Sequence, residues 1–379
     1  MDSLKIANPF VIGKYISDEY FCDRLQETEF LKKQIVNGRN VALISSRRMG
    51  KSGLIHHLFA QQSVLDSYYC FYIDVYATLS FNEFIYLFGK AIYEQLKPRE
   101  TVWTERFFDI VRSLRVGFKL DPQTGSPSFD ISIGDIQSPL TTLDEIFQYL
   151  EEADRPCVVA FDEFQQITNY SEKNTEALLR TKIQQCKQSQ FVFAGSKRHL
   201  MSNMFNSPAK PFYQSTIIMG LEPIPLSSYR EFAIRMFAER KKQIDTEAIE
   251  NIYDSFEGCT WFVQMMLNEL FAMTPANGIC TLDLCPIAFD NVVSRLTMGY
   301  VEQLNNLPVK QRQLLQAIAK EGRVKGITSA AFIKKYKLTS ASSVQAALKP
   351  LLKSDILTND NGQYRIYDYF FAQWLKEAF

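Results

Sequence analysis

The chain has 379 residues, of which 46% are hydrophobic and 22% charged. These values are typical of a globular protein of two or three domains, and they exclude a disordered, collagen-like or low-complexity chain. Lysine plus arginine balance aspartate plus glutamate at 42 each, but residues 307–379 hold 12 basic and only 5 acidic side chains. We therefore expect a basic C-terminal region on an acidic body.

The seven cysteines include no Cys-x-x-Cys pair, and the chain has only three histidines. This inventory argues against a zinc site and favours reduced thiols in the cytoplasm. The first residues, MDSLKIANPF, do not have the pattern of a signal peptide, and no run of 18 apolar residues predicts a membrane span. We expect a cytoplasmic protein without a membrane partner.

Strand-like and helix-like segments alternate in the first 222 residues. The pattern predicts strands over residues 40–45, 68–75, 156–161, 190–194 and 216–219, and helices over residues 27–36, 51–61, 80–96, 142–153 and 172–188. This alternation predicts an α/β fold with a mostly parallel sheet that helices cover on both faces. Residues 115–134 alternate around prolines and a glycine, which predicts a β-hairpin.

The strand pattern stops after Pro223 and Pro225, and residues 226–300 are expected to be helical. Three short helices, a strand–turn–strand and a terminal helix then fit residues 305–379, which is typical of a winged helix. In its third helix, residues 341–353, Pro350 should kink or end the helix. We divide the chain into an α/β core at 1–222, a helical region at 223–304 and a winged helix at 305–379.

The strongest motif is SSRRMGKS, residues 45–52, which fits the phosphate-binding pattern GxxxxGK[ST] except at Ser45. A strand precedes it and a helix follows it, so backbone N–H groups and the helix N-terminus would hold phosphates. Lys51 would neutralise their charge, and Ser52 would place a hydroxyl on Mg²⁺. The alternative is a chance match with a solvated lysine. The predicted nucleotide contacts are Ser45, Ser46, Arg47, Arg48, Met49, Gly50, Lys51, Ser52 and Gly53.

A second motif, CVVAFDE, is an apolar strand that ends in two acids. Asp162 would hold Mg²⁺, and Glu163 would orient and polarise the attacking water. An acidic helix start is the alternative. Asp74 ends another strand and is expected either to support the Mg²⁺ site or to serve only as a strand-end carboxylate.

The segment FAGSKR, residues 193–198, is a strand that ends in Gly-Ser. Here Ser196 would lie between Glu163 and the terminal phosphate, although a Gly-Ser turn needs no function. The predicted catalytic residues are therefore Glu163, Lys51 and Ser196.

Together these motifs resemble the AAA+/STAND branch of P-loop ATPases, in particular the archaeal-type ATPases with a C-terminal winged helix. The segment FCDRLQE, residues 21–27, is similar to that family's F-x-x-R-x-x-E motif. The resemblance implies ATP and Mg²⁺ as ligands, Arg24 and Glu27 near the adenine, and a lid around Gly258. Related proteins often have an arginine finger after the strand that precedes Ser196; the sequence does not assign one here, and Arg198 is the nearest guanidinium that could act on a neighbouring copy of the chain.

Three functions stay open at this point. The first is a Mg²⁺-dependent ATPase that acts as a nucleotide-driven switch, with other copies or an unidentified protein as partner. The second is a DNA-associated ATPase that binds duplex DNA through residues 305–379, where Lys334, Lys335 and Lys337 would meet phosphates. The third is a module that holds ATP or ADP without hydrolysis. The aromatic residues of 367–374 are expected to pack rather than to stack on bases.

Overall fold

The computed structural model describes residues 6–95, 118–120, 127–129, 138–360 and 362–379. The chain forms two compact units, of which one is Gly13–Ile224 and the other joins residues up to Ile12 with Pro225–Phe379. The division at 222 and 304 stays a prediction. Among the described residues, no helix has both the length and the apolar character that a membrane span requires.

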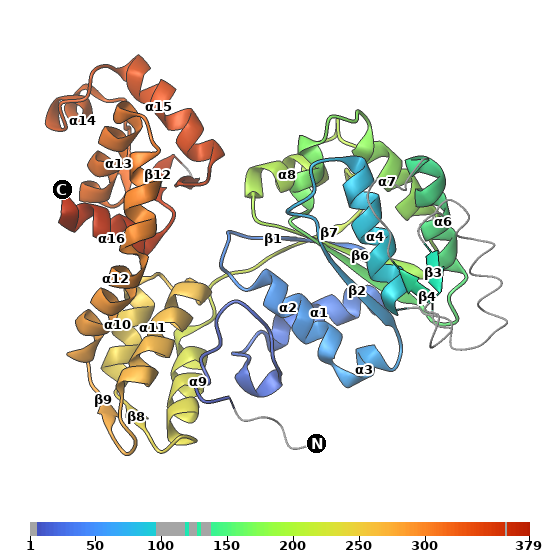
Figure 1. The fold of residues 1–379 in the computed structure, drawn as a ribbon, viewed down its shortest axis with the longest axis horizontal. Helices are drawn as coiled ribbons and strands as arrows, with labels where there is room; N and C mark the ends of the chain where they lie inside the picture. The colour runs from blue at the N-terminus through green and yellow to red at the C-terminus, as the bar shows by residue number, and fades with distance from the viewer. Residues whose placement is uncertain (1–5, 96–117, 121–126, 130–137, 361) are drawn as a thin grey trace. The chain divides into compact units, whose positions relative to one another are not determined.

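The first unit contains a five-stranded sheet with the order β2-β5-β6-β1-β7 (Figure 1). All neighbouring strands are parallel, which confirms the predicted α/β class. The strands are β1 (Val41–Ile44), β2 (Tyr69–Asp74), β5 (Cys157–Asp162), β6 (Ser189–Gly195) and β7 (Ile217–Gly220). All residues of β1, β5 and β6 are buried, as expected for strands that are covered on both faces.

Helices follow most strands of this unit. They are α1 (Leu25–Val36), α2 (Lys51–Ala60), α3 (Gln62–Leu65), α4 (Phe81–Gln95), α6 (Pro139–Glu151), α7 (Thr175–Gln185) and α8 (Arg198–Asn206). Figure 1 shows α2 on one side of the sheet and α4 on the other. The sequence did not predict α3 and α8, because helices of 4 and 9 residues are too short for a clear helical period.

Aromatic side chains form the core between the sheet and α4 and α6. Phe161 of β5 lies 5.3 Å from Phe84 and 5.1 Å from Phe88, between ring centroids. Phe191 of β6 lies 6.0 Å from Phe147 of α6. Alternate strand residues point to the same face, so this packing fixes the register of the strands and where each one ends.

The predicted hairpin is confirmed in the part that the structure describes. Strands β3 (Phe118–Leu120) and β4 (Pro127–Phe129) pair in antiparallel fashion. The remaining residues of the predicted 115–134 segment lie outside the described residues.

The second unit begins with α9 (Leu226–Ala238), α10 (Thr246–Ser255), α11 (Thr260–Met273) and α12 (Leu284–Asn305). The prediction that strands stop after Pro225 is wrong, because β8 (Gln243–Ile244) and β9 (Ile279–Cys280) form a parallel pair. Two-residue strands leave no alternation in a sequence. Phe10 packs on Phe232, Phe237 and Phe271, which ties the N-terminal segment to these helices.

The C-terminal part has the predicted arrangement of three helices, a small sheet and a terminal helix. Its helices are α13 (Val309–Glu321), α14 (Ala330–Lys335), α15 (Ala341–Lys353) and α16 (Tyr369–Ala378). Its strands are β10 (Val324–Lys325), β11 (Leu357–Asp360) and β12 (Gln363–Ile366), in the order β10-β12-β11. The helix α15 does not end at Pro350, because a proline in the last turn removes only one backbone hydrogen bond before the helix stops at Lys353.

Five aromatic residues, here called the aromatic junction, connect α16 to the preceding helices. Phe370 of α16 is fully buried. Its ring centroid lies 5.1 Å from that of Phe256, 5.4 Å from that of Phe262 and 5.4 Å from that of Phe289. Tyr369 adds a contact of 5.0 Å with Phe262. These aromatic residues therefore pack within the unit, as the sequence predicted.

Candidate functional site

The order of the strands brings three separate motifs to one edge of the sheet. Strand β6 lies between β1 and β5, and Ile44 pairs with Gly195 while Phe161 pairs with Phe193. Because the strands are parallel, the residues that follow them emerge at the same edge. We call this place the carboxyl edge; it holds the loop after β1, the two acids at the end of β5 and Ser196 after β6.

The loop between β1 and α2 has the backbone of a tight turn. Arg48 and Gly50 have positive φ angles of 62° and 92°. Ser45 is not among the residues with positive φ, so its Cβ causes no strain where the motif normally has glycine. Lys51 is 6% exposed, and its Nζ donates to the carbonyl oxygens of Ser45 at 3.1 Å and Ser46 at 2.9 Å. The alternative of a solvated lysine is therefore wrong.

Asp162 is the acceptor at the centre of the edge. It is 3% exposed, and its Oδ2 accepts hydrogen bonds from Ser52 Oγ at 2.5 Å and from Tyr72 OH at 2.6 Å. Its Oδ1 accepts from the backbone N–H of Glu163 at 2.9 Å. A buried carboxylate requires such donors. The structure therefore brings Ser52 and Asp162 together, as a shared metal site requires.

Tyr72 is a residue that the sequence analysis missed, because it lies inside a strand and belongs to no motif. Burial raises its pKa, and the negative charge of Asp162 raises it further. The phenol therefore stays protonated and donates to Asp162. The ring of His56 lies 4.2 Å from that of Tyr72, and burial lowers the pKa of this histidine, although Asp162 opposes the shift.

Glu163 lies beside the β6 turn. Its Oε2 accepts hydrogen bonds from Ser196 Oγ at 2.7 Å and from Gln165 Nε2 at 2.5 Å. Arg47 of the loop donates to Ser196 through Nε at 3.4 Å. Sequence analysis predicted that Ser196 and Glu163 act together, and the structure places them in contact. It missed Gln165, whose nearness to Glu163 depends on the short 3₁₀ helix η4 (Phe164–Asn169).

Asp74 ends β2 opposite Asp162 in the register of the sheet. Its Oδ1 accepts from the backbone N–H of Tyr76 at 2.9 Å. Partial burial raises its pKa, and the charges of Asp162 and Glu163 add to this effect. This arrangement fits the alternative in which Asp74 closes the turn at the end of its strand.

Arg24 connects the segment before α1 to the loop. It is 3% exposed and has a positive φ of 69°. Its guanidinium donates to the carbonyl oxygen of Met49 at 3.2 Å and pairs with Glu27 at 2.5 Å. Arg24 thus supports the backbone of the loop, while its contact with a base stays a prediction. Gly53 faces Phe21, because a Cβ there would lie 3.3 Å from Phe21 Cε2.

Two further groups of predicted residues follow the carboxyl edge in the chain. Arg198 begins α8, two residues after Ser196, and its role as an arginine finger stays a prediction. In the C-terminal part, Lys335 pairs with Glu321 at 2.5 Å, whereas the side chains of Lys334 and Lys337 are exposed. Lys337 has a positive φ of 53°.

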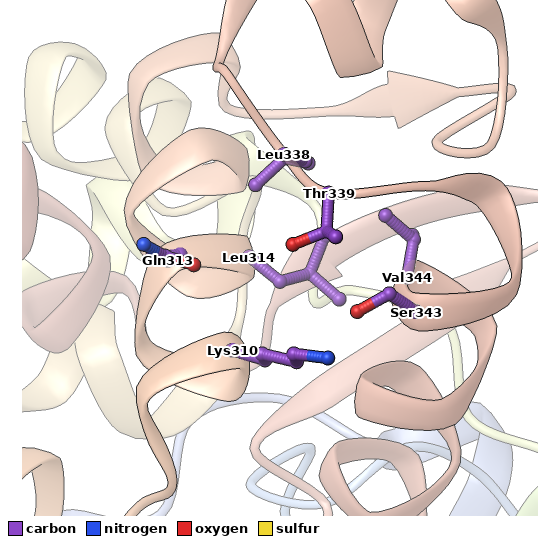
Figure 2. A pocket seen from close by; sticks show the side chains of 7 residues that line it. All are labelled: Lys310, Gln313, Leu314, Leu338, Thr339, Ser343 and Val344. Carbon is purple, nitrogen blue, oxygen red and sulfur yellow. The ribbon is translucent and has the colours of Figure 1, made fainter.

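A small hollow lies between α13 and the start of α15. Figure 2 shows the side chains that surround it, which are Lys310, Gln313, Leu314, Leu338, Thr339, Ser343 and Val344. Its volume of about 10 Å³ is enough for one water molecule and far too small for a nucleotide. Ser340 next to it caps α15, since its Oγ accepts from the backbone N–H of Ser343 at 3.2 Å.

Comparison with known proteins supports the fold. A family model described as a probable winged helix domain matches residues 298–377. No curated protein matches the sequence.

Three solved structures are similar over nearly the whole chain. A Walker-type ATPase of Pyrococcus abyssi is 19% identical with a TM-score of 0.64, and the match covers 97% of this chain and 99% of the other. The ORC2 protein of Aeropyrum pernix, in its ADPNP–ADP complexes, is 14% identical with a TM-score of 0.61, with 98% and 96% covered. The ORC1 protein of Aeropyrum pernix, in complex with DNA, is 12% identical with a TM-score of 0.50, with 94% and 92% covered.

The likeness to these structures confirms the predicted fold class. The five-stranded parallel sheet, the helices that follow it and the C-terminal winged helix occur in the order that the sequence predicted. The resemblance to archaeal-type ATPases thus holds for the fold: the architecture of this chain is similar to that of the Walker-type ATPase of Pyrococcus abyssi, and a winged helix lies at its C-terminal end.

Proposed function

We propose that this chain binds ATP with Mg²⁺, hydrolyses the bond between its β- and γ-phosphates, and acts as a nucleotide-driven switch. The observation that carries the proposal is the convergence of Lys51, Ser52, Asp162, Glu163 and Ser196 at the carboxyl edge. These residues come from three loops that only the strand order brings together. Each has the chemistry that phosphoryl transfer to water requires.

Ser52 and Asp162 fit a magnesium ion. Their oxygens lie 2.5 Å apart, and a hydroxyl with a carboxylate is a donor set that this hard cation prefers. When bound, Mg²⁺ neutralises charge on phosphate oxygens. Lys51 adds a positive charge to the same loop, where backbone N–H groups and the start of α2 favour an anion.

Glu163 is the residue that would take a proton from the attacking water. Its carboxylate adjoins Ser196, which would orient it toward the phosphate chain. Preorganised charges and donors of this kind supply most of the catalysis in phosphoryl transfer.

The test compares hydrolysis of Mg²⁺-ATP by the native chain and by Glu163→Gln. We expect the substitution to lower turnover about 100-fold or more and to leave ATP binding intact. Glu172→Gln is the matched control, because Glu172 is exposed and lies outside the contacts of the carboxyl edge. Equal turnover in both variants would contradict the assignment of Glu163. Bound nucleotide without turnover in the native chain would favour the non-hydrolysing module.

The aromatic junction supports the switch. It joins α10, α11 and α12 to α16, and an ion pair between Glu257 and Arg323 adds a second connection. A nucleotide that shifts the helices after residue 225 would therefore carry the winged helix with them. Hydrogen exchange of the full chain with ATP and with ADP tests this, since a switch requires different protection in the two states.

A second candidate is an ATPase that binds duplex DNA through residues 305–379. The observation in its favour is the excess of basic residues in 307–379, with Lys334 and Lys337 exposed. The similar ORC1 protein of Aeropyrum pernix was solved in complex with DNA. Titration of the chain with duplex DNA at low and at moderate salt tests this candidate, because binding through phosphate contacts weakens steeply as the salt concentration rises. Absence of binding at low salt would remove this candidate.

A further inference from the structure

Gln165 lies two residues beyond Glu163, in η4, and is 3% exposed. Its Nε2 donates to Oε2 of Glu163 at 2.5 Å, and Ser196 donates to the same oxygen at 2.7 Å. We propose that Gln165 is a positioning residue for Glu163: it holds one carboxylate oxygen so that the other receives the proton of the attacking water. This inference rests on the proposed ATPase function.

The pattern of hydrogen bonds distinguishes the two oxygens of Glu163. Within the described part of the chain, both donors to this carboxylate meet Oε2, and none meets Oε1. Two fixed donors restrict rotation of the carboxylate and leave Oε1 to accept from water. A single donor from Ser196 would leave the carboxylate free to turn about that bond.

The backbone conformation of Glu163 brings Gln165 close to its carboxylate. Its φ and ψ of 53° and 38° lie in the left-handed region, which is rare for a residue other than glycine. This conformation turns the chain into η4 directly after β5 and so brings Gln165 back against Glu163. The left-handed conformation of Glu163 and its contact with Gln165 therefore both result from the turn between β5 and η4.

Gly195 makes room for Gln165. A Cβ at Gly195 would lie 2.4 Å from Gln165 Oε1 and 2.5 Å from Met201 Sδ, which no real Cβ tolerates. The last residue of β6 thus admits the amide, and the next residue, Ser196, supplies the second donor. Both hydrogen-bond donors to Glu163, Gln165 and Ser196, therefore depend on the end of β6.

The amide oxygen of Gln165 is evidence against a purely structural role for this residue. Among the residues that the structure describes, none donates a hydrogen bond to the buried Oε1 of Gln165. An unpaired buried amide oxygen is unfavourable, and the core around it would accept an apolar side chain without that cost. The bond that Nε2 makes is to a carboxylate, which is the stronger kind of hydrogen bond.

Gln165→Met tests the proposal, because methionine has a similar size and no donor. We expect kcat for ATP hydrolysis to fall about tenfold, since hydrogen bonds to charged groups are worth that factor or more. The KM and the affinity for ATP should stay within about twofold, because the substituted amide bonds to Glu163 and does not belong to the loop between β1 and α2. Gln166→Met is the matched control: its Nε2 donates to the carbonyl oxygen of Thr78 at 2.8 Å, away from Glu163. The control should keep the native kcat.

A double-mutant cycle separates positioning from structure. In the Glu163→Gln background, Gln165→Met should leave the residual single-turnover rate unchanged, because the carboxylate that it positions is gone. A structural role lowers both backgrounds by the same factor, and that result would overturn the proposal. An unchanged kcat in Gln165→Met would also overturn it.

Two controls keep the result interpretable. Thermal unfolding of each full-length variant shows whether it folds, and Gln165→Leu replaces Gln165→Met if the latter melts well below the native chain. A native chain that binds ATP and does not hydrolyse it overturns the proposed function and this inference together. A native chain that hydrolyses ATP while Gln165→Met and Gln165→Leu match it overturns this inference alone.

Discussion

The carboxyl edge and the aromatic junction each surround a buried residue, Asp162 in one and Phe370 in the other, but they are built from opposite kinds of side chain. At the edge, Ser52, Tyr72 and Glu163 all bond to Asp162, and each donor satisfies a group that burial would otherwise penalise. At the junction, the ring of Phe370 packs against those of Phe256, Phe262 and Phe289, and burial of apolar surface stabilises these contacts.

This difference between the two regions predicts different effects of substitution, on catalysis at the carboxyl edge and on stability at the aromatic junction. A hydrogen bond contributes little net stability, because the unfolded chain bonds to water instead, so substitutions at the edge should act mainly on ligand binding and catalysis. Buried rings contribute through area and packing, so substitutions at the junction should act mainly on folding. The following changes test that separation, beginning with the largest expected effect.

Phe370→Ala should break the junction. It removes a fully buried ring and leaves a cavity among Phe256, Phe262 and Phe289. We expect the unit that contains α16 to lose about 3–5 kcal/mol of unfolding free energy. Hydrogen exchange at amides of α11 and α16 in the full chain measures this loss, and amides of β5 and β6 serve as the internal reference. Unchanged protection of α16 would contradict the role of the junction.

Tyr72→Phe should alter the edge without unfolding it. The change removes one of two donors to Asp162 Oδ2 and keeps the ring that packs against His56. Partners that orient a metal ligand typically contribute about 10-fold or more to metal affinity. We therefore expect the Mg²⁺ concentration at half-maximal ATP hydrolysis to rise about tenfold, with thermal stability nearly unchanged. A loss of stability as large as that of Phe370→Ala would remove the separation between the two regions.

Arg323→Ala tests whether an ion pair near the aromatic junction contributes to stability as the buried rings do. Arg323 forms an ion pair with Glu257, and both side chains are exposed by more than 40%. Exposed ion pairs contribute about 0–1 kcal/mol. Hydrogen exchange of α16 should therefore change little, which would show that the rings, rather than the charges, stabilise this part of the unit.

The sequence alone predicted most of the sheet and the principal motifs. Runs of apolar residues, many of them β-branched or aromatic, placed β1, β2, β5, β6 and β7 within one residue of their observed ends. Local signals of this kind suffice because an apolar run between turn residues has few alternatives. The phosphate-binding pattern was also readable, because Gly50 and Lys51 stand at fixed spacing between a strand and a helix.

Elements without a local period were missed. The pair β8 and β9 has two residues in each strand, and β10 also has two, so neither alternation nor length reveals them. Pro350 was expected to disturb α15, but the helix continues because the proline lies in its last turn.

The sequence by itself determined which chemistry is available: a lysine and a serine after one strand, two acids after another, and a serine after a third. Tertiary structure decided which of these groups meet, because the strand order β2-β5-β6-β1-β7 sets the end of β6 between the loop after β1 and the acids after β5. It also decided the roles of Tyr72 and Gln165, which belong to no motif. Their contacts with Asp162 and Glu163 depend on strand register and on a left-handed turn, and neither leaves a pattern in the sequence.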